Sequence, residues 1–319
     1  MENENNILEI LVNSLWDVGI YCYNKIIHRE IPKFINYELK KTSKSKIFVH
    51  IGKGLHGDVF LDLKENPNTF VVGTTGSGKS VCTKSIITSL VNNYSANQLE
   101  LYLCDLKRVE LNLFKNLEHT KRFVYKIDDV IDTINDVLEE CERRYDLFMK
   151  RNVTNIFEYN NLGGKRLKFQ ILFIEEIVLL LQDTKKEGMK ALKQLLSICR
   201  ASGIYVFITT QRPSADVIDA VVKANINNRI VFKVEDEKNS IICLDSIGAE
   251  LLEGKGHGIF KVGSYKEEFR SYFISDEECK KLIEPFVIKE ELKIKSKQIG
   301  FIENKKDNQV EDLSFLDKL

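Results

Sequence analysis

The sequence predicts an α/β fold in which a mainly parallel β-sheet is covered by helices on both faces. Apolar runs of strand length recur along the chain, and helical patterns separate them. A glycine-rich loop connects one of these runs to a helix, and acidic or polar residues directly follow three others. Since parallel strands end at the same sheet edge, these residues predict a ligand site there.

Composition permits a sizeable core but says little about partners. The chain has 319 residues, 43% of them hydrophobic and 29% charged, which suits one large α/β domain with attachments or two modest domains. Its 47 basic and 47 acidic residues cancel. No overall field therefore draws it to nucleic acid, although a protein that grips DNA through a few residues per subunit needs none.

Cysteine and histidine usage predicts no metal centre built from these residues. The seven cysteines are an odd number without a C-x-x-C pair, and the five histidines lack metal-ligand spacing. This pattern indicates reduced thiols in a cytoplasmic protein without a zinc site.

Residues 1–45 are expected to form an attachment to the main domain. An amphipathic helix is predicted over 7–27, where apolar residues recur at helical spacing and charged or amide residues interrupt the run. It is too polar for a transmembrane segment, so we expect it to pack on its own domain or on a neighbouring subunit. The basic run at 40–46 favours a solvated linker over a phosphate contact. No signal peptide is visible.

The main domain is predicted over 46–285 and begins with a hairpin of strands at 47–52 and 59–63. The next strand, 69–72, leads into a loop of the form G-x-x-x-x-G-K-[ST], followed by a helix over 81–91. The loop residues are Gly73, Thr74, Thr75, Gly76, Ser77, Gly78, Lys79 and Ser80.

This strand–loop–helix context predicts a phosphate-binding loop for ATP with Mg²⁺, rather than a surface loop that happens to contain a lysine. The glycines let backbone N–H groups surround the β-phosphate, at a helix N-terminus that favours negative charge. Lys79 is expected to reach the β- and γ-phosphates, and the hydroxyl of Ser80 to bind Mg²⁺.

The remaining chain alternates strands and helices. Strands are predicted at 99–105, 169–176, 204–210 and 229–234, and helices at 128–151, 187–202 and 215–223. A hairpin over 256–274 is expected to close the domain. Residues 286–319 are charged and poor in apolar residues, so we expect a flexible tail.

Two carboxylates end the strand at 169–176. Glu175 is a candidate Mg²⁺ ligand, through water, and Glu176 is a candidate base that polarises the attacking water. The alternative is a pair of surface glutamates, which four preceding apolar residues disfavour. Gln211 follows the next strand, where it could sense the γ-phosphate.

Arg200, Arg212 and Arg229 are candidates for stabilising charge across a subunit boundary. Arg200 and Arg229 are the two candidate arginine fingers, although an ordinary ion pair or a contact with DNA is the more common role for each of the three residues.

Several blocks follow one another in order from about residue 47 to 280. They include the phosphate loop, the segment Asp105 to Leu111, and the helix motif Glu142-Arg143-Arg144-Tyr145. Further blocks lie at 199–204, 209–214, 218–229 and 248–256. Together these blocks resemble the FtsK/SpoIIIE family of DNA translocases, with Leu106 in place of the family's proline.

The resemblance implies a RecA-like ATPase motor whose subunits form a hexameric ring that pumps DNA, most simply double-stranded and without base readout. It assigns Lys79 and Ser80 to phosphate and Mg²⁺, Glu175 and Glu176 to the family's Asp-Glu pair, and Gln211 to the sensor position.

The chain departs from the family pattern in three respects. Glu175 replaces the usual Asp, and neither the long N-terminal membrane domain nor a complete winged-helix domain is expected. These departures favour a plasmid, conjugative-element or phage DNA pump, which would reach a membrane only through a partner protein of the transfer machinery. Two alternatives stay open: a secretion-type ATPase that moves protein, and a nucleotide-dependent scaffold with weak hydrolysis.

Overall fold

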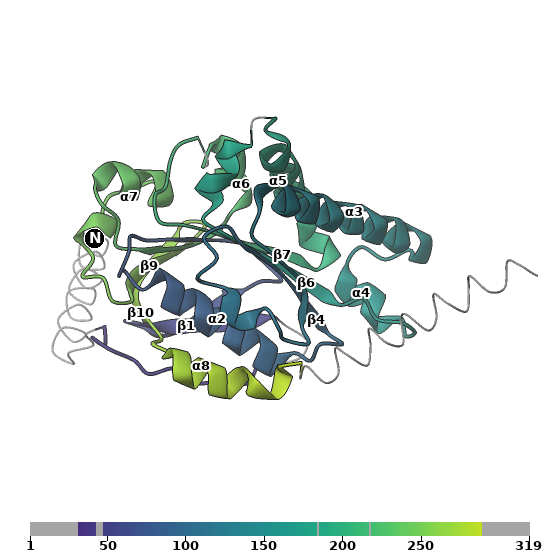
Figure 1. Ribbon diagram of the computed structural model, residues 1–319, viewed down its shortest axis with the longest axis horizontal. Coiled ribbons are helices and arrows are strands. Elements are labelled where there is room, and N and C mark those ends of the chain that lie inside the picture. Colours follow the sequence, from purple (N-terminus) through teal and green to yellow (C-terminus); the bar gives the residue numbers. More distant parts are fainter. Residues whose placement is uncertain (1–30, 43–46, 184, 217, 289–319) are drawn as a thin grey trace, which may run out of the picture.

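The protein was analysed as a computed structural model, which describes residues 31–42, 47–183, 185–216 and 218–288. Ten strands form one mixed sheet with helices on both faces (Figure 1), in the order β2-β1-β10-β9-β8-β3-β7-β6-β4-β5. The predicted fold class is confirmed. The expected helix over 7–27, most of the basic run and the charged tail from 289 onward lie outside the described residues.

The parallel half of the sheet contains six strands, of which all but β5 were predicted from the sequence. It consists of β3 (Asn68–Val72), β4 (Leu99–Asp105), β5 (Thr120–Val124), β6 (Phe169–Glu175), β7 (Ile204–Thr210) and β8 (Asn228–Phe232). Val72 lies opposite Thr210, and Asp105 lies opposite Glu175. The carboxyl ends of β3, β7, β6 and β4 therefore meet at one sheet edge.

Both predicted hairpins form and join the same sheet. One contains β1 (Phe48–Gly54) and β2 (Gly57–Asp62), and the other contains β9 (His257–Val262) and β10 (Tyr265–Ser271). β10 pairs with β1 and β9 pairs with β8, all antiparallel. The first and the last hairpin along the chain thereby lie side by side next to the parallel half.

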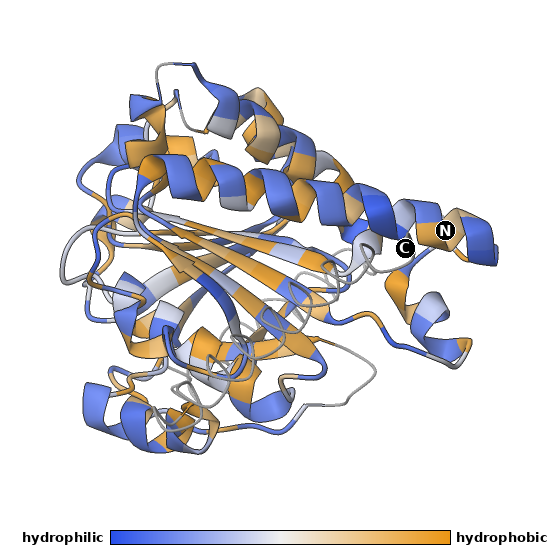
Figure 2. Cartoon of the chain, turned by 45° about the vertical axis from the view of Figure 1, so that its right-hand side comes forward, coloured by the Kyte–Doolittle hydropathy of each residue, from blue (hydrophilic) through white to orange (hydrophobic). Residues whose placement is uncertain are grey.

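Helices cover the two faces unequally. α2 (Lys79–Asn93) and α8 (Asp276–Ile283) cover one face, while the other carries α3 (Ile127–Arg151), α5 (Glu187–Ile198), α6 (Ala220–Asn225) and α7 (Glu237–Leu244). Short α4 (Ile156–Asn161) follows α3. Figure 2 shows apolar strands between these helix layers. In the described part of the chain, no helix has the length and apolarity needed to cross a membrane.

Some boundaries differ from the sequence expectation. The helix expected over 215–223 begins only at Ala220, because the side chain of Asp219 accepts a hydrogen bond from the amide of Val222 at 3.0 Å and caps it. α4, α7, α8 and β5 were not predicted. The sequence did not predict β5 because it is an edge strand that has Lys121 and Arg122 within it and lacks an apolar pattern.

A buried arginine ties α3 to the sheet. Arg144 is only 1% exposed, and its guanidinium donates to Glu140 Oε1 at 2.8 Å and to the carbonyl of Ser202 at 2.7 Å. Burial raises the pKa of Glu140, but hydrogen bonds from Arg143 and Arg144 outweigh it and leave the pKa below its usual value. The carboxylate therefore stabilises the fold when it is ionised.

Glu140→Gln should lower the free energy of unfolding by about 2 kcal/mol at neutral pH, because the buried Arg144 guanidinium loses its anionic partner. The difference from wild type should be present above about pH 4.3 and shrink as pH falls through the lowered pKa of Glu140. Urea unfolding at several pH values measures it. Exposed Glu139→Gln is the control, and an equal effect there would contradict this role.

Candidate active site

The glycine-rich loop connects β3 to α2 in a shape that requires its glycines. Gly76 and Gly78 have positive φ angles of 76° and 112°, which favour residues without a side chain. A Cβ atom on Gly78 would also lie 2.5 Å from the backbone nitrogen of Gly256. The loop therefore needs glycine at position 78 for both conformation and space.

A second loop, Gly254 to Gly256, supports the first. The amide of Gly256 donates to the carbonyl of Ser77 at 2.7 Å, and the amide of Lys255 donates to that of Gly76 at 3.3 Å. Arg270, 5% exposed, donates to the carbonyl of Gly254 at 3.1 Å and so fixes this second loop. The phosphate-loop shape is thus held from outside by β10.

The loop lysine is paired across the sheet edge. Lys79 lies against Glu175, and Thr209 of the intervening strand β7 donates to the same carboxylate. Both side chains of the ion pair are 1% exposed. Burial raises the pKa of Glu175, against the lowering effects of Lys79 and Thr209.

The neighbouring carboxylate is held by other donors. Glu176 has a left-handed backbone with φ 60° and accepts hydrogen bonds from Lys107 Nζ at 2.5 Å and Thr210 Oγ1 at 2.7 Å. The amide of Gln211 also donates to it, at 3.2 Å. Burial raises the pKa of Glu176, but the hydrogen bonds from Lys107, Thr210 and Gln211 outweigh it, so the pKa lies below its usual value.

Gln211 lies between the carboxylates and the phosphate loop. Its side-chain oxygen accepts a hydrogen bond from Thr75 Oγ1 at 3.4 Å, while its own amide contacts Glu176. Gln211 and Thr75 line a pocket of about 390 Å³, and Lys79 and Ser80 line it as well. The structure thus brings the predicted loop, base and sensor residues together at one sheet edge.

Comparison with known proteins identifies the family. The model of the FtsK/SpoIIIE family matches residues 33–242. The chain belongs to the FtsK/SpoIIIE family. Curated relatives include the DNA translocase FtsK of Campylobacter jejuni, 34% identical over 84% of this chain and 29% of the relative, and that of Oceanobacillus iheyensis, 32% identical over 94% and 40%. The chain thus spans about a third of the length of these relatives.

Solved structures give the same fold. The pCW3 conjugation coupling protein TcpA, in a monomer form with ATPγS, is 27% identical and superposes with a TM-score of 0.73 over 80% of this chain and 75% of its own. EssC ATPases 2 and 3 of Geobacillus thermodenitrificans, 20% identical, superpose with a TM-score of 0.70 over 80% of this chain and 51% of that one. At that identity the second likeness concerns the fold alone.

The residues of this FtsK/SpoIIIE chain fit a magnesium ion beside the loop. Ser80 supplies a hydroxyl at the pocket wall, and Glu175 supplies a carboxylate that contacts the neighbouring Lys79. Both are hard oxygen donors of the kind Mg²⁺ prefers. Glu175 Oε atoms are engaged by Lys79 and Thr209, so a metal-bound water would replace one of these contacts.

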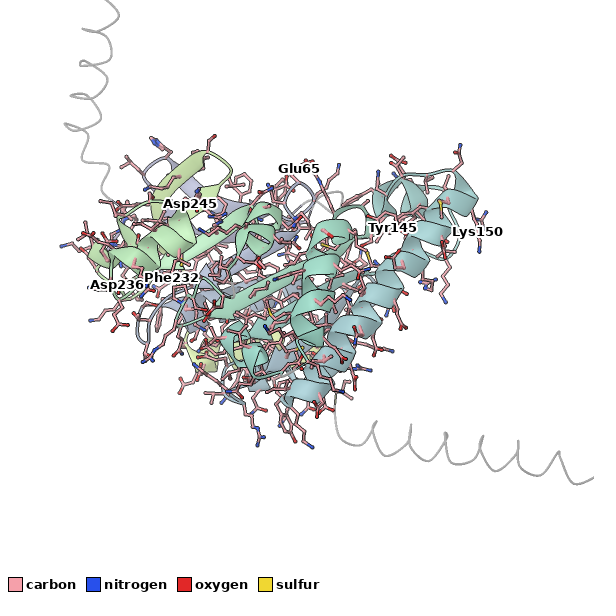
Figure 3. All side chains as sticks on the ribbon, turned by 90° about the horizontal axis from the view of Figure 1, so that it is seen from above. Glu65, Tyr145, Lys150, Phe232, Asp236 and Asp245 are labelled. Carbon is pink, nitrogen blue, oxygen red and sulfur yellow. The ribbon has the colours of Figure 1, made fainter. Side chains whose placement is uncertain are left out.

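The two candidate arginine fingers differ in placement. Arg229 is 9% exposed and donates to the carbonyls of Ile226 and Cys243 and to Asp245, which Figure 3 labels beside α7. Its guanidinium is therefore bound within its own chain, which corresponds to the ordinary ion pair that the sequence analysis left open. Arg200 has a side chain that is 67% exposed, and its guanidinium donates to Glu65, a surface carboxylate, at 3.2 Å.

Arg200 lies far from the phosphate loop of its own chain. It precedes the first residue of β7, whereas the loop adjoins the last. Seven strand residues at about 3.3 Å each separate the two ends by roughly 20 Å. Arg200 is therefore too distant to contact the phosphate loop of its own chain. Arg212 is exposed beside the sensor residue.

Sequence reasoning missed several contributors to this site, among them Lys107, Arg270 and Phe34. Lys107 lies within a block that resembles the family, but nothing in the sequence pairs it with Glu176. Arg270 sits in a strand whose polar pattern resembles a surface hairpin, although it is buried. Phe34 precedes every predicted motif, yet it lines the same pocket as the loop.

Proposed function

We propose that this chain is an ATP-driven DNA motor that binds ATP with Mg²⁺ at Gly73 to Ser80 and hydrolyses it to move double-stranded DNA. The observation that carries the proposal is a set of contacts around the phosphate loop: Lys79 pairs with Glu175, and Gln211 contacts both Glu176 and Thr75 of the loop. A phosphate loop, a metal-binding carboxylate, a base and a sensor are the parts that phosphoryl transfer to water requires.

The resting contacts define what must change when nucleotide binds. Lys79 would leave Glu175 for the β- and γ-phosphates, because a triphosphate offers more negative charge than one carboxylate. Glu175 and Ser80 would then hold Mg²⁺, which neutralises charge on the phosphate oxygens. Glu176 would accept a proton from the attacking water once it parts from Lys107. Gln211 bridges the two sets of contacts and would report the γ-phosphate.

We propose a homo-oligomer, most simply a hexameric ring, in which Arg200 of one subunit acts on the nucleotide of its neighbour. Its exposure and its distance from its own loop support this role. An arginine supplied in this way stabilises charge on the transferred phosphate.

The proposed track is double-stranded DNA gripped through its phosphates, so the interaction should be independent of sequence and sensitive to salt. Relatives named DNA translocase FtsK support this substrate. The likeness to the conjugation coupling protein TcpA supports a role in plasmid, conjugative-element or phage DNA transfer. In this proposal the motor occupies 46–285 in the cytoplasm, and any membrane contact runs through a transfer-machinery partner.

Release of a triplex-forming strand from long linear duplex DNA tests the proposal. Wild type with ATP and Mg²⁺ should displace the third strand, whereas ATPγS or Glu176→Gln should not. Displacement should weaken as salt rises. Basal ATP turnover without displacement or DNA stimulation would instead favour a protein substrate. No turnover at all would favour a nucleotide-dependent scaffold.

A further inference from the structure

The pocket beside the phosphate loop continues onto two exposed aromatic rings. Phe34 and Phe273 line it together with Lys79, Ser80 and Val81. Phe34 is 58% exposed and Phe273 is 43% exposed, and their ring centroids lie 5.2 Å apart at an interplanar angle of 44°. The rings are thus adjacent and partly open to solvent within a pocket that begins at the phosphate-binding loop.

Backbone hydrogen bonds hold the two rings in place. The amide of Phe273 donates to the carbonyl of Ile35 at 2.8 Å, and the amide of Tyr37 donates to the carbonyl of Phe273 at 2.8 Å. Arg270 Nε also donates to the carbonyl of Pro32 at 3.0 Å. The segment 31–37 is therefore fixed alongside the residues that follow β10, and Phe34 is presented on an ordered backbone.

Strand β10, which ends two residues before Phe273, connects the rings to the phosphate loop. Arg270, three residues before Phe273, donates to the carbonyl of Gly254, and the loop at 254–256 contacts Ser77. The pocket consequently has a polar end that suits phosphates and an aromatic end that suits a flat apolar group. A nucleoside triphosphate has this same division between its phosphates and its base.

We propose that Phe34 and Phe273 form the base-binding platform of the nucleotide site, on which the purine base of a nucleoside triphosphate stacks. The inference rests on the proposed function, because it assumes that the triphosphate occupies Gly73 to Ser80. Each base has a π-face that aromatic side chains bind by stacking. Phe34 thereby becomes part of the nucleotide site, although it precedes the first strand.

Comparing a whole nucleotide with its phosphates alone isolates the contribution of the base. Isothermal titration calorimetry would measure the Kd of AMP-PNP with Mg²⁺ and of inorganic tripolyphosphate with Mg²⁺. Phe34→Ala should weaken AMP-PNP binding by about tenfold and leave tripolyphosphate binding unchanged. Phe34→Trp should restore or exceed the wild-type affinity for AMP-PNP, since the larger ring stacks at least as well.

Phe60 provides a matched control elsewhere on the surface. It is 45% exposed and contacts the ring of Phe48 with centroids 5.1 Å apart, but it lies on β2, away from the pocket. Phe60→Ala should change neither affinity. Because Phe34 is exposed, its truncation should leave the fold intact, and thermal unfolding of each variant would verify this.

The outcomes separate the inference from the proposed function. Unchanged AMP-PNP affinity in Phe34→Ala, or equal weakening of both ligands, would overturn the aromatic platform, even with wild-type binding intact. Failure of wild type to bind either ligand would overturn the nucleotide site itself and the platform with it. A loss of affinity in Phe34→Ala that affects AMP-PNP but not tripolyphosphate, and that Phe34→Trp restores, would establish the platform.

Discussion

Lys79→Ala should weaken ATP binding by about a hundredfold or more and destabilise the folded protein at the same time. The ammonium group is the cation that the phosphate loop itself supplies to the pocket. Truncating one partner of a buried charge pair typically costs about 2–5 kcal/mol, roughly 30- to several-thousandfold in affinity. The same truncation leaves Glu175 buried without its cation, since both side chains are 1% exposed. Calorimetric titration with AMP-PNP and urea unfolding measure the two effects separately.

A double variant distinguishes binding from folding. Lys79→Met combined with Glu175→Leu replaces the buried ion pair by apolar side chains of similar volume, so stability should return to within about 1–2 kcal/mol of wild type. ATP binding should stay lost, because no cation remains on the loop. Recovery of ATP binding in the double variant would show that Lys79 acts through the fold alone and would contradict its phosphate role.

Glu176→Gln should lower ATP turnover by about 10²- to 10⁴-fold, because the amide cannot accept the proton of the attacking water. The fold should tolerate the change, since Gln retains an oxygen that can accept from Thr210 and from the amide of Gln211. Affinity for ATP should remain within about threefold of wild type, as the residue does not contact the phosphate loop. Steady-state hydrolysis and equilibrium binding, measured on the same preparation, test both statements.

Exposed Glu118 supplies the control for this substitution. Glu118→Gln should leave turnover at the wild-type level. If Glu176→Gln hydrolysed ATP as fast as wild type, the assignment of the catalytic base would be wrong. If wild type were as inactive as Glu176→Gln, the protein would be a nucleotide-dependent scaffold instead.

The sequence was informative where local geometry and chemistry coincide. The loop from Gly73 to Ser80 could be predicted because its glycines, its lysine and its flanking strand and helix are contiguous. Glu175 and Glu176 could be predicted because a buried parallel strand must deliver its last residues to the same sheet edge as the loop. Both predictions, the phosphate loop and the two carboxylates, depend on hydrophobic periodicity and on the order of the elements along the chain.

Contacts between distant segments could not be predicted in this way. Lys107 meets Glu176 across 69 residues, and Phe34 meets Phe273 because the backbone at 35–37 pairs with Phe273. The strand order places these partners together, and periodicity does not reveal strand order. Arg229 illustrates the same limit: its burial against Asp245 follows from the packing of α7 against β8, which the sequence does not display.

The most direct test of the proposed motor is the rate of ATP turnover with and without long double-stranded DNA, at low and moderate salt. A DNA-dependent motor predicts strong stimulation by DNA, which fades as salt rises and disappears in Lys79→Ala. Basal turnover that neither double-stranded nor single-stranded DNA stimulates would contradict the assignment of DNA as the substrate of this chain.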